Sequence, residues 1–125
     1  MKSKQVKKLD EADGKWTAIE GIENRYHMRV AVIPGKGDCY MVGGSDDAEC
    51  QNPKNKVYCI SKAGDVRAKK GMSVERGRVG LCVGQLISEA STLFQKTYIF
   101  AVGGQGKNGE LLSSVEKYST KADMW

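Results

Sequence analysis

Apolar and polar positions follow the same order in two parts of the chain. In each part a short apolar run ends in two glycines, a polar stretch follows, and a second apolar segment comes next. The first run begins at residue 39 and the second at residue 98. A repeat of this kind is typical of proteins whose small units bury their apolar faces against their neighbours. The glycines that are expected to end the two strands are Gly43, Gly44, Gly103 and Gly104.

The pattern predicts β-strands in both repeats. Residues 26–33 and 78–83 alternate, so that every second position can share one face of a sheet. Residues 39–42 and 97–102 are apolar at nearly every position, as in a strand that is covered on both faces. The other expected strands are 56–61, 66–69, 113–118 and one beginning at Asp123; the expected loops are 45–55, 105–112 and an inserted loop, 85–96.

One segment fits two secondary structures. Leu111, Leu112, Val115 and Tyr118 fall at helical spacing. The corresponding residues of the first repeat read as a strand, and the alignment of the two repeats therefore favours a strand here as well.

A partial copy stands at the front of the chain. Val6 and Trp16 have the same separation as Val115 and Trp125, and Leu9 takes the place of a later tyrosine, Tyr118. The chain is therefore expected to begin inside one four-stranded unit and to stop inside another.

Composition and charge narrow the class of protein. The chain has 125 residues, a net charge of +5 and no apolar stretch long enough to span a bilayer or to act as a signal peptide. We therefore expect a soluble, cytoplasmic protein. Its basic residues gather at the N-terminus and in 67–78 without interleaved aromatics, so nucleic acid is not an expected partner.

The four cysteines match no metal or redox spacing. Cys39, Cys59 and Cys82 lie within apolar runs and are expected to be reduced core residues. Cys50 lies in a polar stretch and is the one cysteine expected to be accessible.

The end of the second repeat closely resembles a kelch repeat. The segment from Val115 to Trp125 places an aromatic, Tyr118, and then a tryptophan at the positions usual in that family. Residues 72–76 are similar to the Met-x-x-x-Arg lead-in that opens a kelch repeat. The first repeat is a degenerate copy, because Ile60 and Val66 replace its two aromatics.

This resemblance implies an all-β, kelch-type β-propeller fragment: about two four-stranded antiparallel blades, with partial strands at both ends. We divide the chain into a basic tail (1–5), the end of a preceding blade (6–22), a degenerate repeat (23–71) and a second repeat truncated in its last strand (72–125). Two blades cannot close a ring, so we expect a piece of a longer chain, a self-assembling partial propeller, or a subunit held by neighbours. The first is favoured because the chain stops within a strand. The expected signature residues besides the glycines are Trp16, Tyr118 and Trp125.

Candidate chemistry is sparse. Residues 104–109 match G-x-G-x-x-G, but a dinucleotide site needs a helix after the glycines, and a loop between strands explains them as well. His27 is the one histidine and is expected in a strand without catalytic partners. The acidic groups at 10–13 and 46–47 lack the spacing of a calcium loop. We expect no cofactor and no metal.

The resemblance implies a non-catalytic module that binds a protein partner through its blade loops. The alternative is a piece of an enzyme on the same fold, such as a sugar oxidase or a sialic acid epimerase. The arginines among the candidate residues can either contact a partner's carboxylates or brace their own loops. The candidate partner-binding residues are Arg25, Arg29, Asp46, Asp47, Arg76, Gln105, Lys107 and Asn108.

Overall fold

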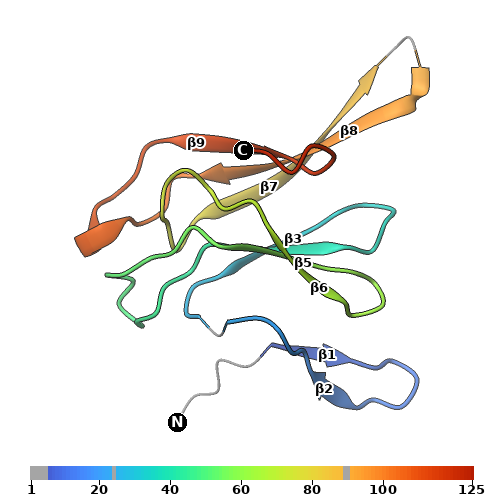
Figure 1. Ribbon diagram of the computed structural model, residues 1–125, viewed down its shortest axis with the longest axis horizontal. Helices are drawn as coiled ribbons and strands as arrows, with labels where there is room; N and C mark the ends of the chain where they lie inside the picture. Colours follow the sequence, from blue (N-terminus) through green and yellow to red (C-terminus); the bar gives the residue numbers. More distant parts are fainter. Residues whose placement is uncertain (1–5, 24, 89–90) are drawn as a thin grey trace.

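Three antiparallel sheets lie in layers in the computed structural model of the chain (Figure 1). The structure describes residues 6–23, 25–88 and 91–125, with side chains for all of these except 86–88 and 91–95. The first sheet holds β1 (Lys7–Leu9) and β2 (Trp16–Ala18). The second holds β3 (Arg29–Val32), β4 (Cys39–Val42), β5 (Val57–Ile60) and β6 (Val66–Lys69). The third holds β7 (Gly80–Ser88), β8 (Ser91–Val102) and β9 (Val115–Ser119).

Each sheet is a meander in which strands adjacent in sequence pair antiparallel. In the third sheet a bridge between Ser119 and Met124 begins a fourth strand where the sequence predicts one. The helical ambiguity at 111–118 resolves as a strand, β9, preceded by a three-residue 3₁₀ turn, η1 (Lys107–Gly109). The all-β prediction is thus confirmed, and the stacked sheets are compatible with neighbouring blades of a propeller. Within the part of the chain that the structure describes, no helix has the length and apolar character needed to cross a membrane.

The middle sheet is covered on both faces, which explains its apolar strands. Side chains alternate along β4, so Tyr40 and Val42 point toward the third sheet while Met41 points toward the first. The larger core lies between the second and third sheets: Ala31, Ile33, Tyr40, Val42, Val57, Cys59, Met72, Val79, Ile99, Ala101 and Tyr118. The smaller core packs Ile22 and the chain around it on Met41, Tyr58 and Ile60.

The second repeat closes on the first through an aromatic cluster. The ring of Tyr118 lies 5.7 Å from that of Tyr40 and 5.0 Å from that of Trp125, measured between centroids. Trp125 also donates its indole N–H to the carbonyl of Lys70, just after β6, at 2.7 Å. Tyr118 and Trp125 are therefore packing anchors, as the repeat pattern predicts. Trp16, expected to be the equivalent anchor, is 64% exposed, so within the described residues it does not fill that role.

The prediction of an inserted loop at 85–96 is wrong for residues 85–88 and 91–96; residues 89–90 lie outside the described residues. Strands β7 and β8 run through those two segments and extend past the stack, with Gln85 paired to Thr97 and Leu86 to Lys96 (Figure 1). Neither glycine nor proline occurs between residues 85 and 102, so the sequence contains no residue that readily breaks the ladder. The strand expected at 26–33 is also shorter than predicted and begins at Arg29, because His27 adopts a positive φ of 58°.

Two cysteines lie opposite to expectation. Cys50 is buried, since its loop folds back until the sulfur faces Gly77; a Cβ on Gly77 would stand 2.3 Å from that sulfur. Cys82 is exposed, because alternation along β7 points it away from the middle sheet. All four cysteines are free thiols.

Candidate functional site

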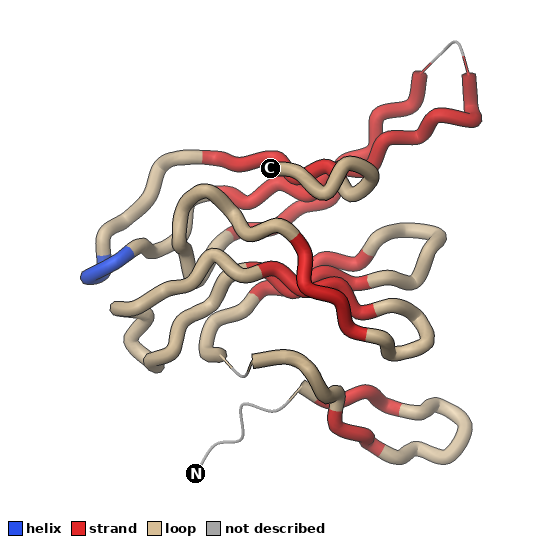
Figure 2. Tube along the Cα trace, viewed as in Figure 1, coloured by secondary structure: helices blue, strands red, loops and turns tan. Residues whose placement is uncertain are grey.

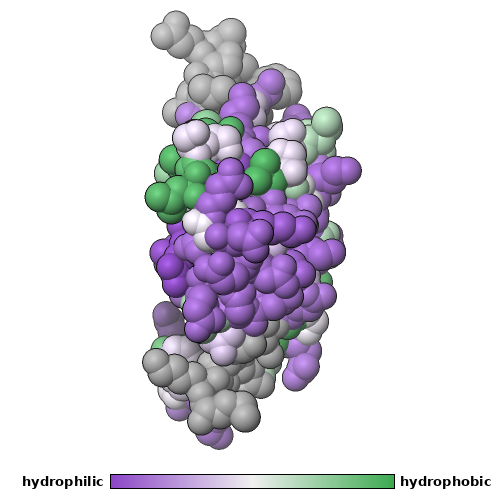
Figure 3. All heavy atoms as spheres, turned by 90° about the vertical axis from the view of Figure 1, so that its left-hand side faces the viewer, coloured by the Kyte–Doolittle hydropathy of each residue, from purple (hydrophilic) through white to green (hydrophobic). Residues whose placement is uncertain are grey.

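The two loops that follow the Gly-Gly pairs lie at the same edge of the stack (Figure 2). We call this edge the loop face and define it by residues 45–55, 73–79 and 105–112. Its surface is mostly hydrophilic, with small apolar areas nearer one end (Figure 3). The loop face is therefore polar, and the loops that form it come from both repeats.

The Gly-Gly pairs let neighbouring segments approach closely. Gly43 has a φ of +69°, and a Cβ there would lie 2.2 Å from the carbonyl oxygen of Arg76. Gly104 has a φ of +96°, and a Cβ there would lie 2.7 Å from the carbonyl oxygen of Gly77. Any larger residue would meet both strain and a backbone clash. Each pair thus ends its strand and seats residues 76–77 at the base of the loop face.

Arg76 braces the base of the second loop. Its side chain is 0% exposed, and its guanidinium donates to the carbonyls of Gly103 and Ser114 at 2.9 and 3.0 Å. It also donates to the hydroxyl of Ser114 at 2.9 Å and to the carboxylate of Glu116 at 2.8 Å. Glu116 in turn accepts hydrogen bonds from the backbone and hydroxyl of Ser73 at 2.7 and 2.5 Å. This network fixes the lead-in segment against β9.

The pKa of Glu116 reflects this network. Burial alone raises the pKa of a carboxyl group, but the hydrogen bonds from Ser73 and the Arg76 guanidinium outweigh it, and the pKa of Glu116 is lowered. The carboxylate is therefore held ionised beside the buried guanidinium.

Arg25 takes the equivalent position in the first repeat but has different partners. It is also buried, and it pairs with Glu23 and, through Nε at 3.8 Å, with Asp46. Aligning the repeats places Tyr58 where Glu116 stands, so β5 supplies no carboxylate. The acidic partners come from the neighbouring loops instead.

The first loop is closed by Asp47. Its carboxylate accepts the backbone N–H groups of Gln51 at 2.6 Å and Asn52 at 2.9 Å, and the Ser45 hydroxyl at 3.0 Å. Desolvation raises the pKa of Asp47, but these hydrogen bonds outweigh it and the net pKa is lowered. Asp46, next to it, is exposed and lies 3.1 Å from the ammonium group of Lys54.

Hydrogen bonds join the two loops into one surface. The backbone N–H of Asn108 donates to the carbonyl of Gln51 at 3.0 Å, and the amide of Gln105 donates to the carbonyl of Glu49 at 3.3 Å. Arg78 lies between them and donates to the Gln105 side chain at 3.3 Å. These contacts cross from one sheet to the next, so the loops hold a common arrangement.

Arg78 and His27 also hold the loop face, although neither is among the candidate residues of the sequence analysis. Arg78 donates to the carbonyl of Ala48 at 3.4 Å, and Nε2 of His27 lies 2.5 Å from the same oxygen. Both residues have positive φ, 51° and 58°, and each stands two positions after a buried arginine. That shared position, visible once the repeats are aligned on Arg25 and Arg76, is the signal that could have identified them.

The structure divides the candidate partner-binding residues into two groups. Arg25 and Arg76 are buried and occupied as described above, so neither is available for direct contact with a partner; this corrects their place among the binding candidates. Asp47 and Gln105 are half-buried and hold the loops. Four are exposed: Arg29, Asp46, Lys107 and Asn108. Arg29 uses its Nε to donate to the carbonyl of Val79 at 3.2 Å.

The other candidate chemistry receives no structural support. Residues 107–109 form a single 3₁₀ turn and β9 follows, so the G-x-G-x-x-G segment is not followed by the helix that a pyrophosphate would need. The glycines belong to the loop between β8 and β9. Within residues 6–23, 25–88 and 91–125, no three side chains among histidine, cysteine and the acids gather as they would around a metal ion.

A comparison with known families matches part of the chain. The family model described as the Kelch motif matches residues 88–125, which span β8, the second loop, β9 and the closing tryptophan. No curated protein matches the chain.

Proposed function

We propose that this kelch-repeat protein is a protein-interaction module without catalytic activity of its own, and that its partner binds the loop face. The observation that supports this most directly is the joining of the two loops by hydrogen bonds between Asn108 and Gln51 and between Gln105 and Glu49. Loops held in one arrangement lose little conformational entropy on binding. Exposed loops on a rigid scaffold are also where binding residues concentrate.

The exposed groups suggest what kind of partner fits. Asp46, Glu49 and Glu110 present carboxylates, while Lys107 presents an ammonium group. A surface with both signs of charge suits a protein partner with a complementary mixed surface, rather than the uniformly charged backbone of a nucleic acid. We place the protein in the cytoplasm, where its four free thiols would stay reduced.

A charge-reversal experiment tests the proposal. The double variant Lys107→Glu/Glu110→Lys changes two exposed positions of the loop face and keeps the net charge. The matched control, Lys62→Glu/Asp65→Lys, makes the same exchange in the turn between β5 and β6, at the opposite edge of the stack. Immobilised wild-type chain and both variants are exposed to the same cell lysate, and captured proteins are identified by mass spectrometry.

We expect at least one protein that the wild type and the control retain and the loop-face variant loses. That protein, once purified, should bind the loop-face variant at least tenfold more weakly than the control. Circular dichroism must show strand content unchanged in both variants. Equal capture by the two variants would contradict the proposal.

A further inference from the structure

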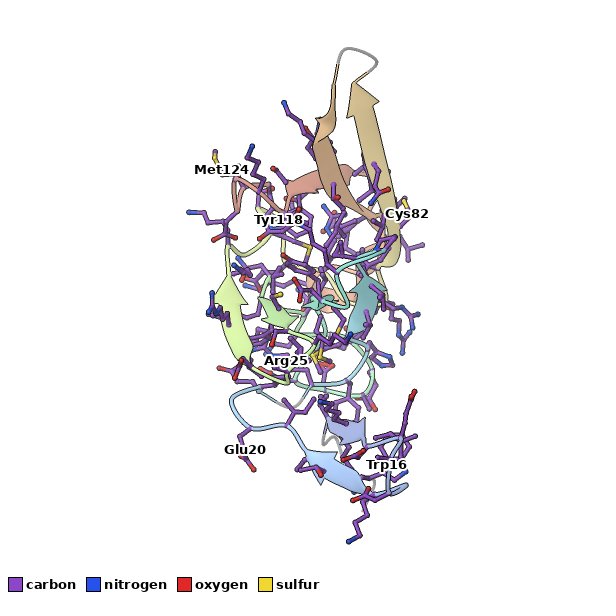
Figure 4. All side chains as sticks on the ribbon, turned by 90° about the vertical axis from the view of Figure 1, so that its right-hand side faces the viewer. Trp16, Glu20, Arg25, Cys82, Tyr118 and Met124 are labelled. Atoms are coloured by element: carbon purple, nitrogen blue, oxygen red, sulfur yellow. The ribbon has the colours of Figure 1, made fainter. Side chains whose placement is uncertain are left out.

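Two exposed apolar faces lie at opposite ends of the stack. At one end the outward side of the third sheet carries Cys82, Phe100, Val102 and Val115, with the exposed Lys117 beside Phe100; Val102 is 45% and Val115 57% exposed. At the other end Leu9 and Trp16 are paired across β1 and β2, on the side opposite Val6, and are 40% and 64% exposed. Figure 4 shows Trp16 at one end of the stack and Cys82 in the sheet at the other.

The interface between the second and third sheets shows what such faces can bury. On the side of the second sheet, Tyr40 and Val42 of β4 belong to the larger core. On the side of the third sheet, Tyr118 lies 5.7 Å from the Tyr40 ring, with Trp125 packed beside it. Two aromatics near the end of one repeat thus cover the aromatic that precedes the Gly-Gly pair of the other.

The two exposed faces carry the equivalents of these residues. Phe100 precedes the second Gly-Gly pair as Tyr40 precedes the first, and Val102 stands where Val42 does. At the front of the chain, Leu9 and Trp16 have the spacing of Tyr118 and Trp125. The outward side of the third sheet therefore corresponds to the face of the second sheet that is covered within the chain. The outward side of β1 and β2 corresponds to the face of the third sheet that covers it.

We propose that the chain self-associates head to tail: the Leu9–Trp16 face of one copy packs on the Phe100–Val102 face of a second copy. The contact extends the stacking already present between the second and third sheets, which is the reason for choosing a second copy as the occupant. Since the two faces are different patches of one chain, the contact is heterologous, and it either closes a ring or continues as an open stack. This inference does not depend on the proposed binding at the loop face, because the loop face stays exposed in both the ring and the open stack.

Sedimentation velocity over a concentration series tests the proposal. The wild-type sedimentation coefficient should rise with concentration. Trp16→Glu removes one face and Val102→Glu removes the other, so each variant alone should stay at the monomer value. Val32→Glu is the matched control: it is an exposed strand valine, 60% accessible, that belongs to neither face, and its association should equal that of the wild type.

Mixing the two variants gives the sharpest result. Trp16→Glu keeps the third-sheet face and Val102→Glu keeps the β1–β2 face, so an equimolar mixture should form dimers and nothing larger. A second readout is the thiol of Cys82, whose labelling rate should fall as wild-type concentration rises and stay constant for Trp16→Glu. Both variants are first checked for native strand content by circular dichroism.

Several outcomes would overturn the proposal. A wild type that stays monomeric across the series would do so, as would association of Val102→Glu alone, which would mean that two β1–β2 faces meet each other. A mixture in which both variants stay monomeric would also count against it. Loss of association in Val32→Glu would show nonspecific aggregation instead of a defined contact.

Discussion

The buried pair of Arg76 and Glu116 gives the most demanding stability prediction. Replacing Arg76 by methionine keeps an unbranched apolar stem but removes the guanidinium and all four of its hydrogen bonds. The Glu116 carboxylate, only 10% exposed, would then have no counter-ion at its side. Breaking a buried ion pair by removing one partner typically costs about 3–5 kcal/mol.

That loss is a large part of the about 5–15 kcal/mol that stabilises a typical domain. Glu116→Gln should cost less, about 1–3 kcal/mol, because the guanidinium keeps its hydrogen bonds to Gly103 and Ser114, and the amide oxygen can still accept one from Ser73. The double variant should lose less than the sum of the two single losses, since removing both partners leaves no unpaired charge. The matched control is Arg78→Met, where the exposed guanidinium should contribute under about 1 kcal/mol.

Urea unfolding followed by circular dichroism gives the free energy of unfolding for the wild type and the four variants. If Arg76→Met is unfolded in the absence of urea, a double variant that still folds would show that the unpaired carboxylate causes most of the loss. The reasoning would be refuted if Arg76→Met cost no more than Arg78→Met, or if the losses at Arg76 and Glu116 were simply additive.

Three further predictions concern single contacts. The pKa of Glu116 lies below its ordinary value of 4.5, so the stability that its ionised carboxylate contributes should be complete above pH 4.5 and fall as the pH drops further. The free energy of unfolding of Glu116→Gln should lack this acid-dependent loss, and identical pH profiles for the wild type and the variant would contradict the prediction. Gly77→Ala places a Cβ 2.3 Å from the Cys50 sulfur and should cost about 1–3 kcal/mol in urea unfolding, largely restored by adding Cys50→Ala; no restoration would rule out this clash as the cause. Tyr118→Phe removes the hydrogen bond to Asp123 at 2.6 Å and should lower the free energy of unfolding by about 1–3 kcal/mol, whereas an unchanged value would mean that the hydroxyl contributes nothing.

Much of the fold could be predicted from local pattern. Strands β4, β5, β6 and β9 lie within a residue or two of their expected ranges, because short apolar runs bounded by glycine or polar turns are strong strand signals. The helical spacing at 111–118 did not lead to a wrong prediction, because the aligned segment of the first repeat independently indicated a strand. The extension of β7 and β8 was not predicted. Its mixed composition shows no clear strand pattern, and the two segments pair with each other.

The candidate site was less predictable, because its roles depend on contacts distant in sequence. Arg76 braces the structure through Glu116, 40 residues later, and no local sequence pattern predicts that pairing. Cys50 lies in a polar stretch and is buried only because its loop folds back onto Gly77. The exposed candidates Lys107 and Asn108 were easier to identify, since polar residues between two strands are usually on the surface.

The stacking of the second repeat on the first is the claim on which the loop face and both proposals depend. Nuclear Overhauser spectroscopy on the folded chain tests it directly, because the rings of Tyr40 and Tyr118 lie 5.7 Å apart and those of Tyr118 and Trp125 lie 5.0 Å apart. We expect cross-peaks between the ring protons of both pairs, and loss of the first pair's cross-peaks in Tyr40→Leu. A chain with native strand content and no contact between Tyr40 and Tyr118 would contradict the stacked arrangement.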